Sequence, residues 1–312
     1  MSALQRLGIS VKQYDSVVSE SQHQTDEAFG FKWAKRDTYE SEVSKANMRR
    51  WLLERYCAGD ASRLNAWLAG ERKIILDAGC GAGFSGLLFF GDILREHDYL
   101  GIDISSAIDV ARARFEEIEM PGDFLRADIS SLEIPDASVD MIFSEGVLHH
   151  TDSTSKSLNY LAQKLVPGGR FLFYVYRKKA LIREFTDDAI REALRPLSDE
   201  EAWEALKPLT KLGIALGELE HEINVKDAIP FLGIAAGKLD VQRFFYWNVC
   251  KAYYRPEMSF DEMHHINFDW FRPLNCHRHT PDEIRAWCTE AGLTIEHIDV
   301  QEAGISVVAQ RK

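Results

Sequence analysis

Five short apolar segments, separated by stretches with helical spacing, constrain the fold of this chain more than any other feature. They cover residues 73–79, 99–105, 123–129, 139–145 and 169–176. Gly, Asp and Pro bound them, and each is apolar along most of its length, which is typical of strands buried on both faces of a parallel sheet. Because helical patterns connect the segments, they predict a βαβ series and therefore an α/β fold.

Helical patterns dominate the segments on either side of this series. Residues 38–57 are polar with apolar positions at helical spacing, and residues 180–265 are mostly helical, with helix-start signals at Ser198 and Ser259. We expect an N-terminal helical arm over residues 1–70 and a helical insertion that acts as a lid.

The α/β pattern resumes near the C-terminus. Thr280 followed by a proline and Glu283 is a strong helix start, and Gly292 suits the left-handed end of that helix. Two closing strands are expected near residues 293–300 and 304–310. We therefore divide the chain into three parts. They are the arm (1–70), a core (71–178 and 272–312) and the lid insertion (179–271).

Composition excludes several classes of function. The formal net charge is -12, and the longest basic run is residues 177–179, which argues against a nucleic-acid partner. The first residues lack the apolar core of a secretory signal, and no apolar stretch is long enough for a membrane span. The five cysteines include no C-x-x-C pair and predict reduced thiols in a cytoplasmic protein. The sequence does not decide whether the protein forms a homodimer.

A glycine-rich turn follows the first predicted strand. Residues 75–83 read ILDAGCGAG, so that Asp77 ends the strand and Gly79, Gly81 and Gly83 let the backbone turn sharply beside a ligand. A helix starting near Phe84 would point its N–H groups at that ligand. The dinucleotide fingerprint needs a glycine where this chain has Phe84. A tight turn without a ligand explains the glycines equally well.

Acidic residues end the next two strands. Asp103 ends the second strand, where a carboxylate can accept both hydroxyls of a ribose, and Asp128 ends the third, within reach of an adenine amino group. Each acid alone can equally cap the following helix. Three strand ends in the same register favour a ligand site.

With these residues in place, the chain resembles the class I S-adenosylmethionine (SAM)-dependent methyltransferases, in particular the group with the ubiquinone- and menaquinone-biosynthesis methylases. ILDAGCGAG is similar to that family's first motif, and residues 144–150 and 165–170 are similar to the segments after the fourth strand and before the fifth. The resemblance implies a Rossmann-like, seven-stranded, mostly parallel sheet with helices on both faces. It also implies SAM as the cofactor.

The resemblance also implies the cofactor contacts. The methionine end of SAM would lie near the glycine loop and Asp77, the ribose near Asp103, and the adenine near Ile104, Asp128 and Ile129. Ser144 and three residues of the arm would also contact the cofactor. The arm residues are Tyr14, Phe29 and Trp33. Packing of the arm on the sheet edge is an equal alternative.

The candidate catalytic residues follow the fourth and fifth strands. Glu145, His149 and His150 can accept a proton if the acceptor must lose one, and His suits this near neutral pH. The histidines can equally position the cofactor or a helix. Tyr176 and one or two aromatic residues of the insertion can face the sulfonium, although most of those aromatics should form the lid core.

A polar cluster precedes the last helix. His277, Arg278 and His279 are candidate substrate-binding residues, and Arg278 can clamp a carboxylate or phosphate. The alternative is a hydrogen-bonded junction between lid and core. The His and Cys spacing matches no closed zinc pattern, so we predict no metal site.

The predicted function is a SAM-dependent methyltransferase for a small-molecule or secondary-metabolite acceptor. One rival is a SAM-consuming cyclase or lyase on the same fold, such as an enzyme that forms azetidine-2-carboxylate and releases methylthioadenosine. A non-catalytic SAM-binding module and a nicotinamide oxidoreductase are the others, and Phe84 argues against the last.

Overall fold

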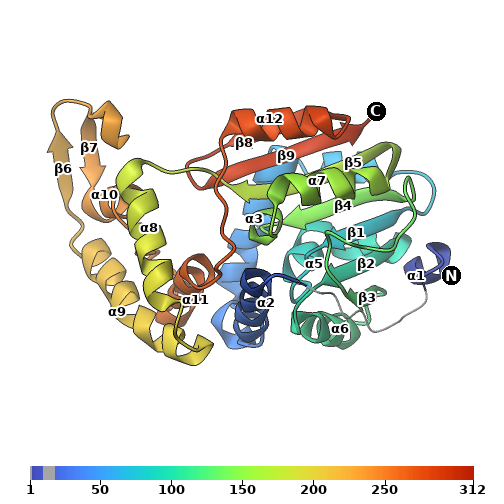
Figure 1. Cartoon of the computed structure of the whole chain (residues 1–312), viewed down its shortest axis with the longest axis horizontal. Helices are drawn as coiled ribbons and strands as arrows, with labels where there is room; N and C mark the ends of the chain where they lie inside the picture. Colours follow the sequence, from blue (N-terminus) through green and yellow to red (C-terminus); the bar gives the residue numbers. More distant parts are fainter. Residues whose placement is uncertain (1, 10–17) are drawn as a thin grey trace.

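The computed structural model describes residues 2–9 and 18–312 and is built around one seven-stranded sheet (Figure 1). The strand order is β3-β2-β1-β4-β5-β9-β8. Strands β1 to β5 pair in parallel, and β9 runs antiparallel to both of its neighbours. This arrangement confirms the predicted α/β class and mostly parallel sheet. Tyr14, a predicted cofactor contact, lies outside the described residues.

Every predicted strand of the sheet is present. Their bounds are β1 (Ile74–Ala78), β2 (Asp98–Asp103), β3 (Asp123–Arg126), β4 (Val139–Glu145), β5 (Leu165–Tyr176), β8 (Leu293–Val300) and β9 (Gly304–Arg311). Side chains alternate between the two faces, so that Ile75 and Phe143 join one apolar core while Leu76 and Ile142 join the other. Both faces of the central strands are therefore buried, which explains their continuous apolar runs.

Helices cover both faces of the sheet. Their bounds are α1 (Ala3–Arg6), α2 (Glu20–Trp33), α3 (Glu42–Cys57), α4 (Ser62–Leu68), α5 (Phe84–Phe90), α6 (Ala107–Glu117), α7 (Thr154–Lys164) and α12 (Pro281–Glu290). Residues of α3, α4, α5 and α6 contribute to one core, and residues of α1, α7 and α12 contribute to the other. The helix predicted after the glycine loop starts at Phe84, as expected.

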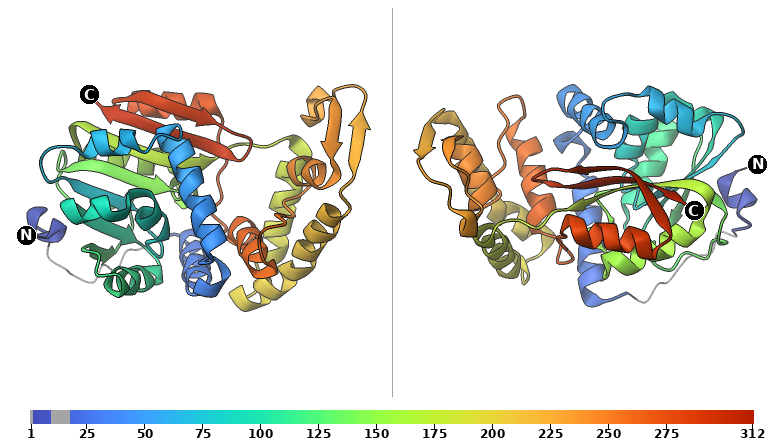
Figure 2. Two further views of the ribbon diagram at one scale, coloured as in Figure 1. Left: turned by 180° about the vertical axis from the view of Figure 1, so that it is seen from behind. Right: turned by 90° about the horizontal axis from the view of Figure 1, so that it is seen from above.

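The segment between β5 and α12 forms a helical unit beside the sheet. It contains α8 (Leu181–Leu194), α9 (Asp199–Glu218), β6 (Glu222–Val225), β7 (Gly237–Asp240), α10 (Val241–Asn248) and α11 (Phe260–Phe271). Figure 2 shows this unit to one side of the sheet, and its helix α11 packs against α2 of the arm. The β6–β7 hairpin was not expected, because its alternating, mostly exposed residues carry only a weak pattern.

The helix-start signals read from the sequence are capping boxes in the structure. Ser198, Ser259 and Thr280 each accept a hydrogen bond from the backbone three residues on, and the glutamate there bonds back to the cap. Gly292 has a φ of 68°, in the left-handed region that favours glycine. None of the helices in residues 2–9 and 18–312 combines the length and apolar character needed to cross a membrane.

A buried ion pair holds the helical unit together. Arg183 and Asp187 on α8 are each 1% exposed, and the Asp187 Oδ2 atom accepts from Arg183 Nε and from Trp270 Nε1, both at 2.8 Å. Arg183 also donates to the carbonyl of Tyr246 on α10. Because removing one member of a buried pair strands the other charge, this cluster should dominate the stability of the unit.

We therefore predict that Asp187→Ala lowers the free energy of unfolding by about 3–5 kcal/mol, the cost of leaving a buried guanidinium unpaired. Urea denaturation followed by circular dichroism measures this change. The matched control is Asp109→Ala, which removes an exposed pair with Arg112 on α6 and should have little effect. Equal effects of the two substitutions would contradict the role assigned to Asp187.

Candidate functional site

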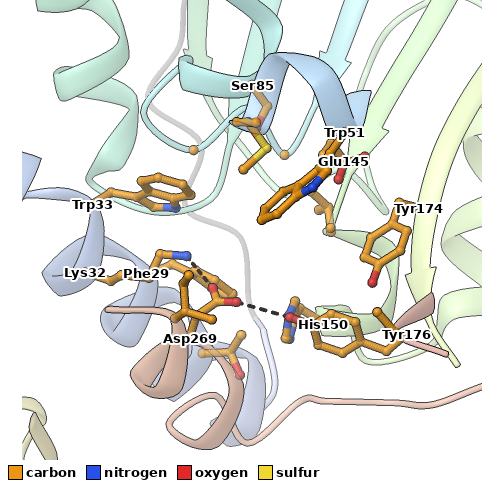
Figure 3. Close-up of a pocket in the computed structure, with 18 of the residues that line it drawn as sticks. Phe29, Lys32, Trp33, Trp51, Ser85, Glu145, His150, Tyr174, Tyr176 and Asp269 are labelled. Carbon is orange, nitrogen blue, oxygen red and sulfur yellow. Dashed lines mark hydrogen bonds and ion pairs between the residues drawn. The ribbon is translucent and has the colours of Figure 1, made fainter. Parts of the chain in front are cut away.

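A cavity of about 520 Å³ lies at the carboxyl ends of the central strands, within the size range of small-molecule sites (Figure 3). The sheet contributes residues that follow β1, β2, β3 and β4. Helices α2 and α3 and the helical unit supply the other walls. The wall residues that the arm, the core and the helical unit contribute include Asp26, Phe29, Lys32, Trp33, Trp51, Arg55, Gly79, Gly81, Asp103, Ile104, Asp128, Ile129, Glu145, His150, Tyr174, Tyr176, Arg243, Tyr246, Trp247, Lys251, Tyr253 and Asp269.

The glycine loop forms one end of the cavity. Gly79 and Gly81 have φ values of 82° and 51° and belong to the cavity wall. A Cβ atom on Gly81 would lie 2.8 Å from the Nε1 atom of Trp33, and one on Gly79 would overlap Val147. Glycine is therefore required at both positions. Gly83 has a positive φ too, but it packs against Phe115 of α6 and is not part of the wall.

Asp103 lies beside this loop with hydrogen-bonding capacity to spare. Its Oδ2 atom accepts from the backbone N–H of Gly81 at 2.8 Å, and its Oδ1 atom accepts from the backbone and hydroxyl of Ser105 at 2.8 and 2.6 Å. Burial raises the pKa of its carboxyl despite these bonds. Since a carboxylate accepts about four hydrogen bonds, a ligand hydroxyl in the cavity can add to those present.

A second carboxylate from the arm faces Asp103. Asp26 of α2 lines the cavity, and burial raises its pKa to about 6, with the charge of Asp103 adding to the rise. Arg126 approaches it at 3.6 Å and offsets only part of this effect. Two facing carboxylates favour a ligand that brings hydrogen-bond donors or positive charge. No sequence motif marked Asp26.

The predicted adenine contacts also lie on the wall. Ile104, Asp128 and Ile129 line the same end as Asp103. The carboxylate of Asp128 accepts from the backbone and the hydroxyl of Ser130, at 2.9 and 2.6 Å. It therefore closes a local turn and caps no helix, and it still borders the cavity.

Two predicted cofactor contacts lie behind the wall. Asp77 is 2% exposed and accepts a 2.5 Å hydrogen bond from the hydroxyl of Tyr99, while burial raises its pKa to about 7. Ser144 is fully buried and donates to the carbonyl of Ala78 at 2.9 Å. Neither lines the cavity. Both brace the end of β1, and their expected contacts with the cofactor stay predictions.

Glu145 lies on the wall, but both of its oxygens are occupied. One accepts from the guanidinium of Arg55 and the other from the hydroxyl of Tyr56, both on α3. Arg55 also lies over the ring of Tyr174, at 4.2 Å from the centroid. The carboxylate therefore anchors α3 to the sheet. Arg55 was not predicted.

The two candidate histidines differ in position. His150 lines the cavity, and its Nδ1 atom bonds the carbonyl of Asn275, so that Nδ1 carries the proton and Nε2 has the lone pair. Burial lowers the pKa of His150 to about 4, which keeps the ring neutral at pH 7. His149 is fully buried outside the wall, its ring centroid lies 3.8 Å from that of Tyr176 with the two rings tilted, and burial holds its pKa well below the usual range. His149 therefore lies behind the wall, and no described group bonds either of its ring nitrogens.

A charged network closes the wall opposite the glycine loop. The carboxylate of Asp269 on α11 accepts from Lys32 of α2 and, at 3.1 Å, from the hydroxyl of Tyr176 at the end of β5 (Figure 3). Burial and the charge of Asp269 raise the pKa of Tyr176 well above its usual value. The network joins the arm, the helical unit and the sheet, and Lys32 was not predicted.

Aromatic rings line the space between these ends. Phe29 and Trp33 project from α2, Trp51 from α3, and Tyr174 and Tyr176 from β5 (Figure 3). Phe29 and Trp33 thus lie where the arm was expected to approach the cofactor. The ring of Trp33 also holds Lys32, whose Nζ atom is 4.0 Å from its centroid.

The polar cluster before α12 lies outside the cavity. Arg278 donates to Glu184 at 2.8 Å and to Asp188 at 2.7 Å, both on α8. His277 and His279 bond Thr151 and Thr154 beside α7. These residues join the helical unit to the core, which leaves the predicted substrate clamp without structural support. Among the described residues, no group of three or more His, Cys, Asp or Glu side chains is placed to hold a metal ion.

Comparison with known proteins identifies the core. Residues 76–173 match the model of a methyltransferase domain. An uncharacterized methyltransferase of Mycobacterium bovis is 32% identical over 107 residues, which are 34% of this chain and 52% of that protein. The malonyl-[acyl-carrier protein] O-methyltransferase of Serratia marcescens is 28% identical over 152 residues, or 48% and 54% of the two chains. The chain thus spans about half the length of these relatives.

The fold has a solved counterpart. The magnesium protoporphyrin IX methyltransferase of Synechocystis, solved with bound SAM, aligns over 96% of this chain and 100% of its own, with a TM-score of 0.50 and 12% identity. These matches do not single out the ubiquinone-biosynthesis group. They identify a methyltransferase domain over residues 76–173, and the solved counterpart shares the fold of the chain.

Proposed function

We propose that this chain transfers the methyl group of SAM to a small-molecule acceptor. The observation that carries the proposal is how far the cavity extends. It begins at the glycine loop and Asp103 and continues past Tyr176 to Trp247 and Lys251 of the helical unit. Cofactor and acceptor would therefore occupy different ends of one cavity.

The residues at the glycine-loop end fit the adenosyl part of SAM. Asp103 has unused acceptor capacity for ribose hydroxyls, and Asp26 supplies a second carboxylate at the same end. Ile104 and Ile129 offer apolar surface for the adenine ring, and Gly79 and Gly81 keep side chains away from the loop. We assign these residues to cofactor binding, together with Phe29 and Trp33 of the arm.

Methyl transfer mainly requires that the enzyme align the acceptor atom with the methyl group of the sulfonium and exclude water. Bound SAM would supply an activated methyl group on its sulfonium. Trp33, Trp51 and Tyr174 surround the middle of the cavity, where aromatic faces stabilise a cation by about 0.5–2 kcal/mol. His150 is the predicted catalytic histidine that lines the cavity, and no described group engages its Nε2 atom. We assign it as the proton acceptor for acceptors that must lose a proton.

The assignment of Asp103 predicts a cofactor-binding defect. Asp103→Ala should weaken the affinity for S-adenosylhomocysteine by about 10–100-fold, because hydrogen bonds to a charged group are worth roughly 1.5–3 kcal/mol. Isothermal titration calorimetry measures this, with circular dichroism as the check on folding. Asp109→Ala on the outer face of α6 is the matched control. An unchanged affinity in Asp103→Ala would exclude this carboxylate from the cofactor site.

The products of SAM distinguish methyl transfer from cyclisation. Incubated with SAM alone, the protein should release no methylthioadenosine above the rate of spontaneous decay, because its proposed reaction needs an acceptor. Chromatography with mass detection follows both products. Methylthioadenosine formed catalytically without an acceptor would replace our proposal with a SAM cyclase or lyase. S-adenosylhomocysteine formed only with an acceptor supports the methyltransferase.

A further inference from the structure

The lid end of the cavity carries positive charge without matching negative charge. We define the lid end as Arg243, Tyr246 and Trp247 of α10 with Lys251, Tyr253 and Arg255 of the segment that follows it. The other cations of the wall are paired, since Lys32 binds Asp269 and Arg55 binds Glu145. The ion pairs among the described residues include no cation of the lid end.

Lys251 is the deepest of these cations. It is 7% exposed, and its Nζ atom donates to the carbonyl of Ile266 at 3.2 Å and lies 4.7 Å from the ring centroid of Trp270. The charge of Asp269 raises the pKa of Lys251, but the two groups are not within ion-pair distance. The Asp269 carboxylate is already bound by Lys32 and Tyr176. A buried ammonium without a carboxylate is costly, so a ligand charge at this point would be strongly favoured.

Arg243 adds a second cation on the same side. Its guanidinium donates to the carbonyl of Tyr254 at 2.5 Å and lies 5.0 Å from the ring of Tyr246, so it has donors left for a ligand. Arg255 is exposed at the rim. The carboxylates of the wall that remain unpaired near this side, Glu54 and Glu302, are exposed to solvent, where water screens them.

The rings of the lid end limit what else the ligand can be. Tyr246, Trp247 and Tyr253 present apolar faces beside the two cations. Such a wall favours a flat or apolar body, whereas Lys251 and Arg243 favour a carboxylate or a phosphate. A neutral, hydroxyl-rich molecule would leave the ammonium of Lys251 without compensation.

We propose that the acceptor is a small molecule with an apolar or aromatic body and an anionic group, a carboxylate or a phosphate, that binds Lys251 and Arg243. This inference rests on the proposed function and names the substrate class of the same site. The anionic group would anchor the acceptor at the lid end and leave its other end toward the glycine loop.

The protonation of Lys251 gives the proposal a second readout. Burial lowers its pKa to about 8, while Asp269 on α11 raises it, Arg183 and Asp187 on α8 act in opposite directions, and Cys276 raises it. The ammonium is therefore mostly present at pH 7 and is lost as the pH rises through 8. Affinity for an anion that does not itself titrate in this range should fall in the same interval.

The test uses benzoate, benzyl alcohol and inorganic phosphate as probes. Each is titrated into the full chain, with and without S-adenosylhomocysteine, and followed by the fluorescence of the tryptophans, which include Trp247 in the wall. We expect benzoate to bind at least tenfold more tightly than benzyl alcohol at pH 7. Lys251→Met should lower the benzoate affinity at least tenfold and abolish its decline between pH 7 and 9.

Two further variants keep the test decisive. Lys211→Met, an exposed lysine on α9, should leave benzoate binding unchanged, and Arg243→Gln should weaken it if Lys251→Met does not fold. Equal binding of benzoate and benzyl alcohol, no binding of either anion, or wild-type affinity in Lys251→Met would overturn the proposal. So would an equal loss of S-adenosylhomocysteine affinity, since Lys251 would then serve the cofactor. Failure of the wild type to bind S-adenosylhomocysteine would contradict the proposed function instead. The titrations without S-adenosylhomocysteine would still test whether the lid end binds an anion.

Discussion

The shape of this site depends on one half-buried carboxylate. Asp269 belongs to α11, and its two oxygens take hydrogen bonds from Lys32 of the arm and Tyr176 of the sheet. Burial alone would raise its pKa, but the charges of Lys32 and Lys251 outweigh this effect and hold the pKa well below its usual range. Without the Asp269 carboxylate, the charge of Lys32 would lose its partner, which is costly. This carboxylate therefore holds the three parts of the chain together around the cavity.

The parts of the fold that repeat a local pattern could be predicted from the sequence. Strands with continuous apolar runs, capping boxes at Ser198, Ser259 and Thr280, and the left-handed Gly292 all follow from neighbouring residues. The placement of Gly79, Gly81 and Asp103 at one end of a cavity followed from the rule that ligands bind at the carboxyl ends of parallel strands.

The rest of the site depends on contacts between distant residues. Lys32 and Asp269 are separated by 237 positions, and Arg55 and Glu145 by 90, so no local pattern marks either pair. The same reason explains why the partners of Arg278 could not be predicted. Its cationic side chain suggested a substrate clamp, but Glu184 and Asp188 of α8, at separations of 94 and 90 positions, already satisfy it. Residue type alone could not distinguish these outcomes.

The distribution of charge along the cavity agrees with two binding regions, one for the cofactor and one for the acceptor. Carboxylates gather at the glycine-loop end, where Asp26 and Asp103 face each other, and unpaired cations gather at the lid end around Lys251. A ligand that is cationic or rich in hydroxyl groups suits the first end, and an anionic one suits the second. Aromatic rings fill the interval between them.

The most direct test of this account is a crystal structure with S-adenosylhomocysteine. The account predicts ribose hydroxyls on the Asp103 carboxylate, adenine beside Ile104 and Ile129, and open space from the sulfur to Lys251. A complex in which the cofactor lies away from Asp103, or in which it extends to Lys251 and leaves no space for an acceptor, would contradict it.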